Sequence, residues 1–124
     1  MTRLVLESWL LLFYADTIMR FRGFRHLHDA VRKKIVCLEK SIGIPYEQLS
    51  RAMDIACVFY FKPILCLQRS AATVLLMRRY GWKAEMVLGA QLLPFLSHAW
   101  VEIGGIVVND KPYVTETFQV LERC

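Results

Sequence analysis

The stretch from Cys66 to Asp110 decides how this chain folds, because the spacing of its apolar residues changes within it. Residues 66–81 read CLQRSAATVLLMRRYG, with apolar side chains every three to four positions and a glycine after the last turn. This pattern predicts a helix that begins near Cys66 and ends before Gly81. Three later runs are short, apolar and typical of strands, namely AEMVL at 84–88, HAWVEI at 98–103 and IVVN at 106–109.

The segments around these runs predict how the strands are connected. Gly104–Gly105 predicts a two-residue hairpin turn. Gly89–Ser97, which contains Pro94, predicts a loop between two strands. A last strand is expected at Thr117–Leu121.

The residues before Pro63 predict helices. Apolar positions recur at helical spacing in three segments, namely residues 4–21, residues 26–41 and a segment that begins at Pro45. Helices followed by antiparallel strands define an α+β fold. The length of 124 residues fits one domain, 1–124, in which a helical part (1–62) precedes the Cys66 helix and a small antiparallel sheet (63–124).

The composition narrows the classes of function. Hydrophobic residues make up 56% of the chain, which indicates either a very apolar core or an apolar surface for a partner, and we favour the partner. The net charge is +5, but the basic residues lack the aromatic interleaving of single-strand binders, which argues against nucleic acid. The apolar run at 4–14 is too short to span a bilayer, so a membrane role is not expected.

The four cysteines indicate neither a metal site nor a redox motif. They are irregularly spaced and form no C-x-x-C pair: Cys37, Cys57, Cys66 and Cys124. No metal and no cofactor is therefore expected. The N-terminal residues lack the cleavage site of a signal peptide, so we expect reduced thiols and a cytoplasmic location.

Two residues of the deciding stretch have the chemistry of a thiol enzyme. Cys66 lies at the expected helix N-terminus, where unpaired N–H groups and the helix dipole favour a thiolate. His98, which opens a strand, carries an imidazole that can accept the thiol proton and later protonate a leaving amine. Taken alone, each is more often structural, as a buried cysteine or a strand histidine.

Asp110 closes the strand after the hairpin turn, where its carboxylate would hold His98 in the required tautomer. The alternative is a plain turn residue. A two-residue turn aligns Val101 with Val108 and puts His98 and Asp110 on opposite faces of the hairpin. A Cys-His-Asp triad therefore requires a bulge, a longer loop or a divergence of the strands near Asn109, and we predict one of these.

Other polar and aromatic residues of this half carry weaker signals. Gln68 and Arg69, near the helix start, are expected either to contact substrate or to fix the helix. Glu102, like Glu85, is expected on an exposed strand face, and Trp100 in the core or in a groove wall.

Several blocks of this half together resemble a known family. They are CLQRSA at 66–71, RRYGWKA at 78–84, VLG at 87–89, HAWVE at 98–102 and VVND at 107–110. The resemblance is to the transglutaminase-like cysteine protease of lasso-peptide biosynthesis, the protease part of the B protein, and it covers Pro63 to about Leu121. It implies a papain- or transglutaminase-like fold, with Cys66 as nucleophile, His98 as general acid and base, and Asp110 as the residue that orients His98.

The resemblance implies a leader peptidase. Such an enzyme cuts a ribosomally made precursor peptide between leader and core through a thioester, and a separate ATP-dependent cyclase then closes the ring. The chain resembles the split form, in which a small partner protein holds the leader. Two alternatives stay open, namely another thiol-dependent acyl transfer of the transglutaminase or deamidase kind, and a non-catalytic peptide-binding module.

Overall fold

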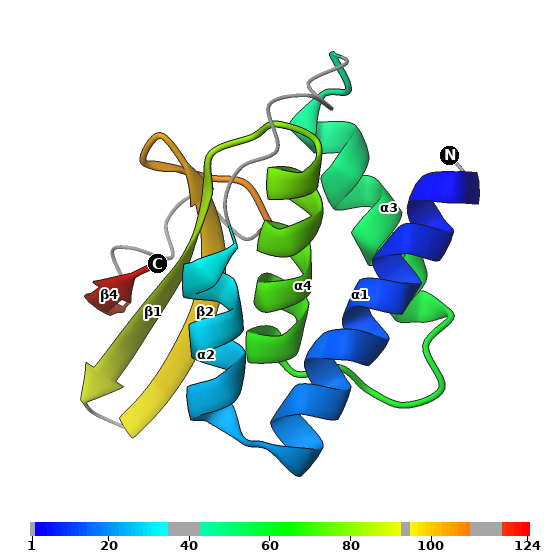
Figure 1. Ribbon diagram of the computed structural model, residues 1–124. Coiled ribbons are helices and arrows are strands. Elements are labelled where there is room, and N and C mark those ends of the chain that lie inside the picture. Colours follow the sequence, from blue (N-terminus) through cyan, green and yellow to red (C-terminus); the bar gives the residue numbers. More distant parts are fainter. Residues whose placement is uncertain (1, 35–42, 93–94, 110–117) are drawn as a thin grey trace.

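The computed structural model describes residues 2–34, 43–92, 95–109 and 118–124 (Figure 1). Four helices precede four strands, which confirms the predicted α+β fold. The helices are α1 (Thr2–Phe21), α2 (Phe24–Lys33), α3 (Tyr46–Val58) and α4 (Cys66–Arg79). The strands are β1 (Ala84–Leu92), β2 (Phe95–Ile103), β3 (Ile106–Val107) and β4 (Gln119–Arg123).

Helix α4 is the centre of the molecule. It lies between the sheet on one side and α1 and α3 on the other (Figure 1). Ten of its 14 residues are buried, including the small residues Ser70, Ala71 and Ala72, which let neighbouring elements approach closely. A helix that is buried on nearly all sides is a core helix, and α4 therefore fixes the positions of the elements around it.

Both ends of α4 are where the sequence predicts them. Cys66 is its first residue, and Leu65 before it has an extended backbone. At the other end Gly81 has φ +91°, and the N–H groups of Gly81 and Trp82 donate to the carbonyls of Arg78 (3.2 Å) and Met77 (3.0 Å). This pair of bonds is a Schellman motif, which requires a residue that tolerates positive φ.

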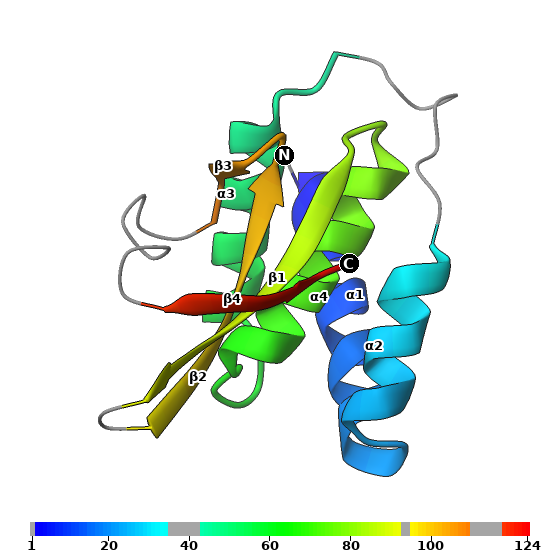
Figure 2. The same ribbon diagram turned by 90° about the vertical axis from the view of Figure 1, so that its left-hand side faces the viewer.

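The strands form one antiparallel sheet in the order β3-β2-β1-β4. Figure 2 views the molecule from the side of this sheet, and β4 crosses in front of β1 and β2 in that view. Ile103 pairs with Ile106 across Gly104–Gly105, which confirms the predicted two-residue hairpin turn. One face of the sheet packs on α4 through residues such as Val101 and Met86. The other face carries a smaller apolar cluster around Trp100 and Val87.

The predicted loop at Gly89–Ser97 is wrong for residues 89–92 and 95–97, which belong to strands, while Pro94 lies outside the described residues. Strand β1 continues through Gly89 to Leu92, and β2 begins at Phe95, so that Gly89 pairs with His98. Gly89 is a glycine because a Cβ there would lie 2.6 Å from the ring of Trp100. The sequence alone does not distinguish a strand glycine that accommodates a neighbouring ring from a glycine that begins a loop.

Two other element boundaries also differ from prediction. Helix α2 ends at Lys33, because Lys34 has an extended backbone, whereas the sequence predicts a helix over 26–41, of which residues 35–41 lie outside the described residues. The guanidinium of Arg78 binds the carbonyls of Val31 and Lys34, which satisfies the end of the helix. The last strand is Gln119–Arg123 instead of Thr117–Leu121.

Glu102 is buried and not, as predicted, on an exposed face, since only 1% of it is accessible. Its carboxylate accepts hydrogen bonds from Trp100 Nε1 (2.8 Å) and from Arg123 Nε (3.3 Å). Strand β4 brings Arg123 to this carboxylate, and a paired, hydrogen-bonded charge can be buried. Trp100, fully buried, lies in the core as expected.

Candidate active site

Cys66 occupies the first position of α4, and its thiol is half-buried and free. The first helical hydrogen bond of α4 runs from the N–H of Arg69 to the carbonyl of Leu65 (3.1 Å). The N–H groups of the residues before Arg69, Cys66 among them, therefore have no helical partner. Free N–H groups and the positive end of the helix dipole favour negative charge at this position.

His98 lies on β2, is half-buried, and pairs with Gly89 of β1. Its ring packs beside two aromatic rings, with centroid distances of 5.3 Å to Phe118 and 5.9 Å to Trp100. Trp100 is itself held by its hydrogen bond to Glu102. The aromatic neighbours therefore restrict the orientation of the imidazole.

Cys66 and His98 line the same pocket, although 32 positions separate them in the sequence. The pocket has a volume of about 230 Å3 and lies between the first turn of α4 and the β2–β3 hairpin. Its lining residues are Ile64, Cys66, Arg69, Ser70, His98, Ala99 and Asn109. The structure thus brings together two of the three residues predicted for a triad.

The hairpin diverges beside this pocket, as predicted. Strand β3 ends at Val107, although the N–H of Val108 still donates to the carbonyl of Val101 (3.0 Å). The N–H of Val101 donates to Oδ1 of Asn109 (2.7 Å), where a regular ladder would use the carbonyl of Val108. Asp110 itself lies outside the described residues, and its role stays a prediction.

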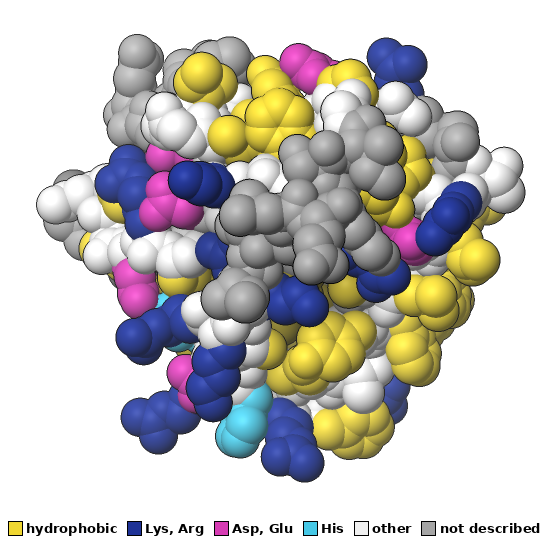
Figure 3. Space-filling view, turned by 45° about the horizontal axis from the view of Figure 1, so that its top comes forward, with side chains coloured by type: hydrophobic (Ala, Val, Ile, Leu, Met, Phe, Trp, Pro, Cys, Tyr) yellow, Lys and Arg dark blue, Asp and Glu magenta, His cyan; other side chains and the backbone are white. Residues whose placement is uncertain are grey.

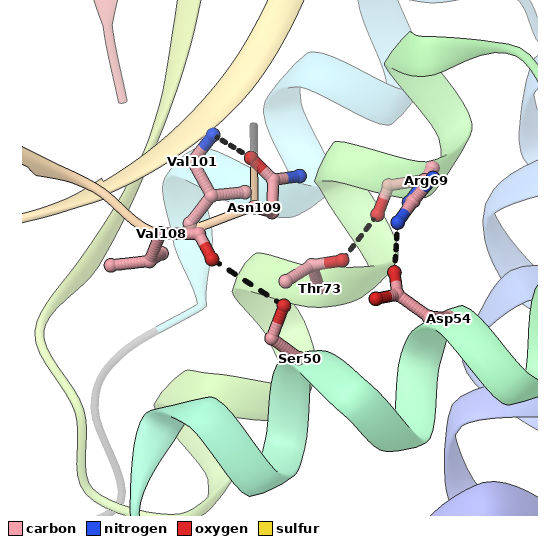
Figure 4. A network of polar contacts seen from close by, with 7 residues as sticks. All are labelled: Ser50, Asp54, Arg69, Thr73, Val101, Val108 and Asn109. Atoms are coloured by element: carbon pink, nitrogen blue, oxygen red, sulfur yellow. Dashed lines mark hydrogen bonds and ion pairs between the residues drawn. The ribbon is translucent and has the colours of Figure 1, made fainter. Parts of the chain in front are cut away.

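A network of polar contacts holds α3, α4 and the hairpin together around the pocket (Figure 4). Arg69 forms an ion pair with Asp54 of α3, and its carbonyl accepts a hydrogen bond from Thr73 Oγ1 (2.7 Å). Ser50 Oγ donates to the carbonyl of Val108 (3.4 Å). Arg69 therefore links α4 to α3 and also forms part of the pocket wall, and whether it contacts substrate stays a prediction.

The segment that leads into Cys66 is anchored on α1. Trp9 Nε1 donates to the carbonyl of Phe59 (3.4 Å), and Tyr60 Oη donates to Asp16 Oδ2 (3.0 Å). Lys62 Nζ forms an ion pair with Asp16 Oδ1 (3.0 Å). Burial, together with the Asp16 carboxylate, raises the pKa of Tyr60 to about 12. Asp16 is a residue that the sequence analysis missed, because nothing local indicates that an acid on α1 meets residues 60 and 62.

Asn109 is the second residue that was missed. The sequence analysis named it only as the place where the hairpin diverges, yet its side chain makes the divergence and lines the pocket. A side-chain amide directly after a short strand was the available signal. Within the described residues, no group of three or more His, Cys, Asp or Glu side chains is arranged to bind a metal ion.

This arrangement, in which a cysteine on a helix N-terminus and a histidine on an antiparallel sheet line one pocket, agrees with a match to known proteins. Residues 9–123 match the family described as the transglutaminase-like superfamily, and the chain belongs to that superfamily. The resemblance found in the sequence is therefore confirmed for the transglutaminase-like superfamily.

The chain is also similar to a more specific relative, the microcin J25-processing protein McjB of Escherichia coli. The two proteins are 38% identical over 56 residues, which make up 45% of this chain and 27% of McjB. The similarity thus covers about a quarter of that relative's length. No solved structure gives a significant match to the chain.

In the described ranges, no helix combines the length and the apolar character that a bilayer span needs.

Proposed function

We propose that this protein is a cysteine peptidase that cuts a ribosomally made lasso-peptide precursor between leader and core. The observation that carries the proposal is the common pocket of Cys66, on the N-terminus of α4, and His98, on β2. Membership of the transglutaminase-like superfamily supports the thiol chemistry, and the partial similarity to a microcin-processing protein supports the peptide substrate.

The reaction follows from the proposed roles of three residues. The Cys66 thiolate attacks the carbonyl carbon of the last leader residue, which forms a C–S bond and moves an electron pair onto the carbonyl oxygen. Collapse of this intermediate breaks the C–N bond, and the His98 imidazolium protonates the departing amine of the core. A water molecule that loses its proton to His98 then hydrolyses the thioester. Asp110 is proposed to hold His98 in the required tautomer.

The proposed partners are a small leader-binding protein and, downstream, an ATP-dependent cyclase that uses the freed amine. An apolar surface supports a protein partner. Hydrophobic side chains gather on the right-hand side of Figure 3, the side on which α1 lies in Figure 1. The exposed large hydrophobic side chains of α1 are Leu6, Leu10, Phe13, Tyr14 and Phe21. The free thiols of Cys57, Cys66 and Cys124, the cysteines that the structure describes, are suited to a reducing cytoplasm, where the proposed reaction would take place.

The test is cleavage of a candidate precursor, with and without its leader-binding partner, followed by mass spectrometry. Wild type should cut one bond, and the partner should stimulate it. Cys66→Ala and His98→Ala should lose cleavage, whereas Cys57→Ala, at a half-buried thiol away from the pocket, should keep it. Cleavage that persists in Cys66→Ala would show that the assignment is wrong.

A second candidate function is thiol-dependent acyl transfer or deamidation, which membership of the superfamily favours. The same experiment separates the two functions, because a peptidase generates a new N-terminus and two fragments. A transferase or deamidase leaves the peptide chain intact and changes only its mass.

A further inference from the structure

We propose that Asn109 is a further catalytic residue, whose side-chain N–H donates a hydrogen bond to the substrate oxygen that becomes negatively charged during attack by Cys66. The inference rests on the proposed function, in which the Cys66 thiolate adds to a carbonyl carbon. The C–S bond forms as the C=O double bond becomes a single bond, and the displaced electron pair resides on the oxygen. That oxyanion needs hydrogen-bond donors on the protein.

The orientation of the Asn109 amide follows from its hydrogen bond. The N–H of Val101 lies 2.7 Å from Oδ1, and a backbone donor requires the oxygen of the amide as its acceptor. The NH2 group is therefore on the other side, and Figure 4 shows it turned away from Val101 toward the helix that carries Arg69 and Thr73. This NH2 group makes no hydrogen bond to another described residue, so its donors are available to a substrate.

Asn109 lies where such a donor is needed. It lines the pocket together with Cys66 and His98, from the hairpin side. On the helix side, the N–H of Cys66 precedes the first helical hydrogen bond and is a second available donor. A carbonyl oxygen between the two walls can accept one hydrogen bond from each, as in enzymes with two-donor oxyanion sites.

The amide is held in place before substrate arrives. The Val101–Asn109 hydrogen bond fixes the oxygen of the amide, and the preceding residue, Val108, is bound on both backbone groups. Its N–H donates to the carbonyl of Val101, and its carbonyl accepts from Ser50 Oγ of α3. A donor that needs no reorganisation during the reaction stabilises a transition state most effectively.

The test compares two reactions of the same thiol. Acylation of Cys66 by p-nitrophenyl acetate passes through an oxyanion, whereas alkylation by iodoacetamide does not. Asn109→Ala removes the donor, and Asn109→Asp removes it but keeps an acceptor for the N–H of Val101. We expect acylation of both variants to slow by about 100-fold or more, and alkylation to stay within a few fold of wild type. Ser50→Ala loosens the same segment but keeps the amide donor, so its acylation should slow by much less than that of the two Asn109 variants. In Cys57→Ala, at a thiol that does not line the pocket, Cys66 should be acylated as in wild type.

Each other outcome overturns the inference. Unchanged acylation in the Asn109 variants means that the amide does not contact the oxyanion. An equal loss of acylation and alkylation means that Asn109 acts by holding the pocket or the thiol in place. If wild-type Cys66 reacts with neither reagent above the rate of Cys57, the proposed function fails as well, and that result is distinct from the other two.

Discussion

Gly89 controls the packing of Trp100, the ring beside His98. A Cβ at this position would lie 2.6 and 2.7 Å from two ring atoms of Trp100 and 3.1 Å from Cβ of Phe118. Gly89→Ala should therefore displace the indole and lower the free energy of unfolding by about 1–3 kcal/mol, as overpacking does in other cores. Chemical denaturation monitored by tryptophan fluorescence measures the loss.

A double-mutant cycle tests whether contact with the Trp100 ring causes the loss of stability in Gly89→Ala. Trp100→Phe replaces the indole by a smaller ring, so Gly89→Ala should cost less in that background than in wild type. An equal cost in both backgrounds would mean that the ring contact is not the origin of the effect.

Tyr60 should make the stability of the protein fall at alkaline pH. Burial and Asp16 raise its pKa from 10.0 to about 12, so above pH 10 the unfolded chain loses a proton that the folded chain keeps. The contribution of Tyr60 is complete below pH 10 and is lost as the pH rises through about 12. Tyr60→Phe should be less stable at neutral pH but should show a flatter decline above pH 10. Parallel declines in urea titrations of the two proteins would contradict this.

Sequence reasoning found the site residues whose chemistry can be read locally. Cys66 follows a proline at a helix start, and His98 opens a strand, so both could be named from their immediate neighbours. Asp16 and Asn109 could not be named in this way. The role of Asp16 depends on a tyrosine 44 residues away, and that of Asn109 on a backbone N–H of the opposite strand.

At the scale of elements, Arg78 connects α4 to α2 and β1. Its guanidinium is buried and donates to the carbonyls of Val31, Lys34 (3.2 Å) and Ala84 (2.9 Å). Arg78→Met keeps the apolar stem but removes the guanidinium donors from these three carbonyls, which should cost about 2–4 kcal/mol of unfolding free energy. Hydrogen exchange in α2 should increase more than in α1.

The neighbouring arginine is the matched control for this prediction. Arg79 is 44% exposed at its side chain and lies 3.8 Å from Glu7. Exposed ion pairs contribute little, so Arg79→Met should change the stability by less than about 1 kcal/mol. Equal losses in the two variants would mean that a general charge effect, and not the buried contacts of Arg78, is responsible.

The helices and strands were predictable where a local pattern determines them. The end of α4 follows from Gly81 and its positive φ, and the β2–β3 hairpin follows from paired glycines. The loop at Gly89–Ser97 was a wrong prediction because glycine there serves a contact with a ring from another strand. The burial of Glu102 was missed for a similar reason, since its partner Arg123 comes from a strand late in the chain.

At the scale of the whole molecule, the apolar composition is divided between a core and a surface. Hydrophobic residues of α4 and of the inner face of the sheet are buried in the core. Other large hydrophobic side chains are exposed on the surface. Those before Cys66 include Phe59, Phe61 and Leu65, which are 72%, 64% and 65% exposed. These side chains come shortly before Cys66, the proposed nucleophile, and they favour the proposal of an apolar partner or substrate.

The two halves of the chain should unfold together. The main cluster of buried residues spans both halves of the chain, with Leu12 of α1, Leu27 of α2, Met53 of α3, Leu76 of α4 and Val101 of β2. Beside it, the described part of the sheet has only the smaller cluster around Trp100 and Val87. Domains of this size with one continuous core usually unfold in a single transition. If residues 1–124 form one domain, as predicted, they should therefore unfold in a single transition.

The measurement compares two probes during urea denaturation. Far-ultraviolet circular dichroism reports mainly on the helices, whereas the fluorescence of a Trp9→Phe, Trp82→Phe variant reports on Trp100 in the sheet. The two transitions should have the same midpoint and slope, because the contacts of α4 with both layers couple their unfolding. A helical signal that persists after the Trp100 signal is lost would show instead that residues 1–62 fold as a unit of their own.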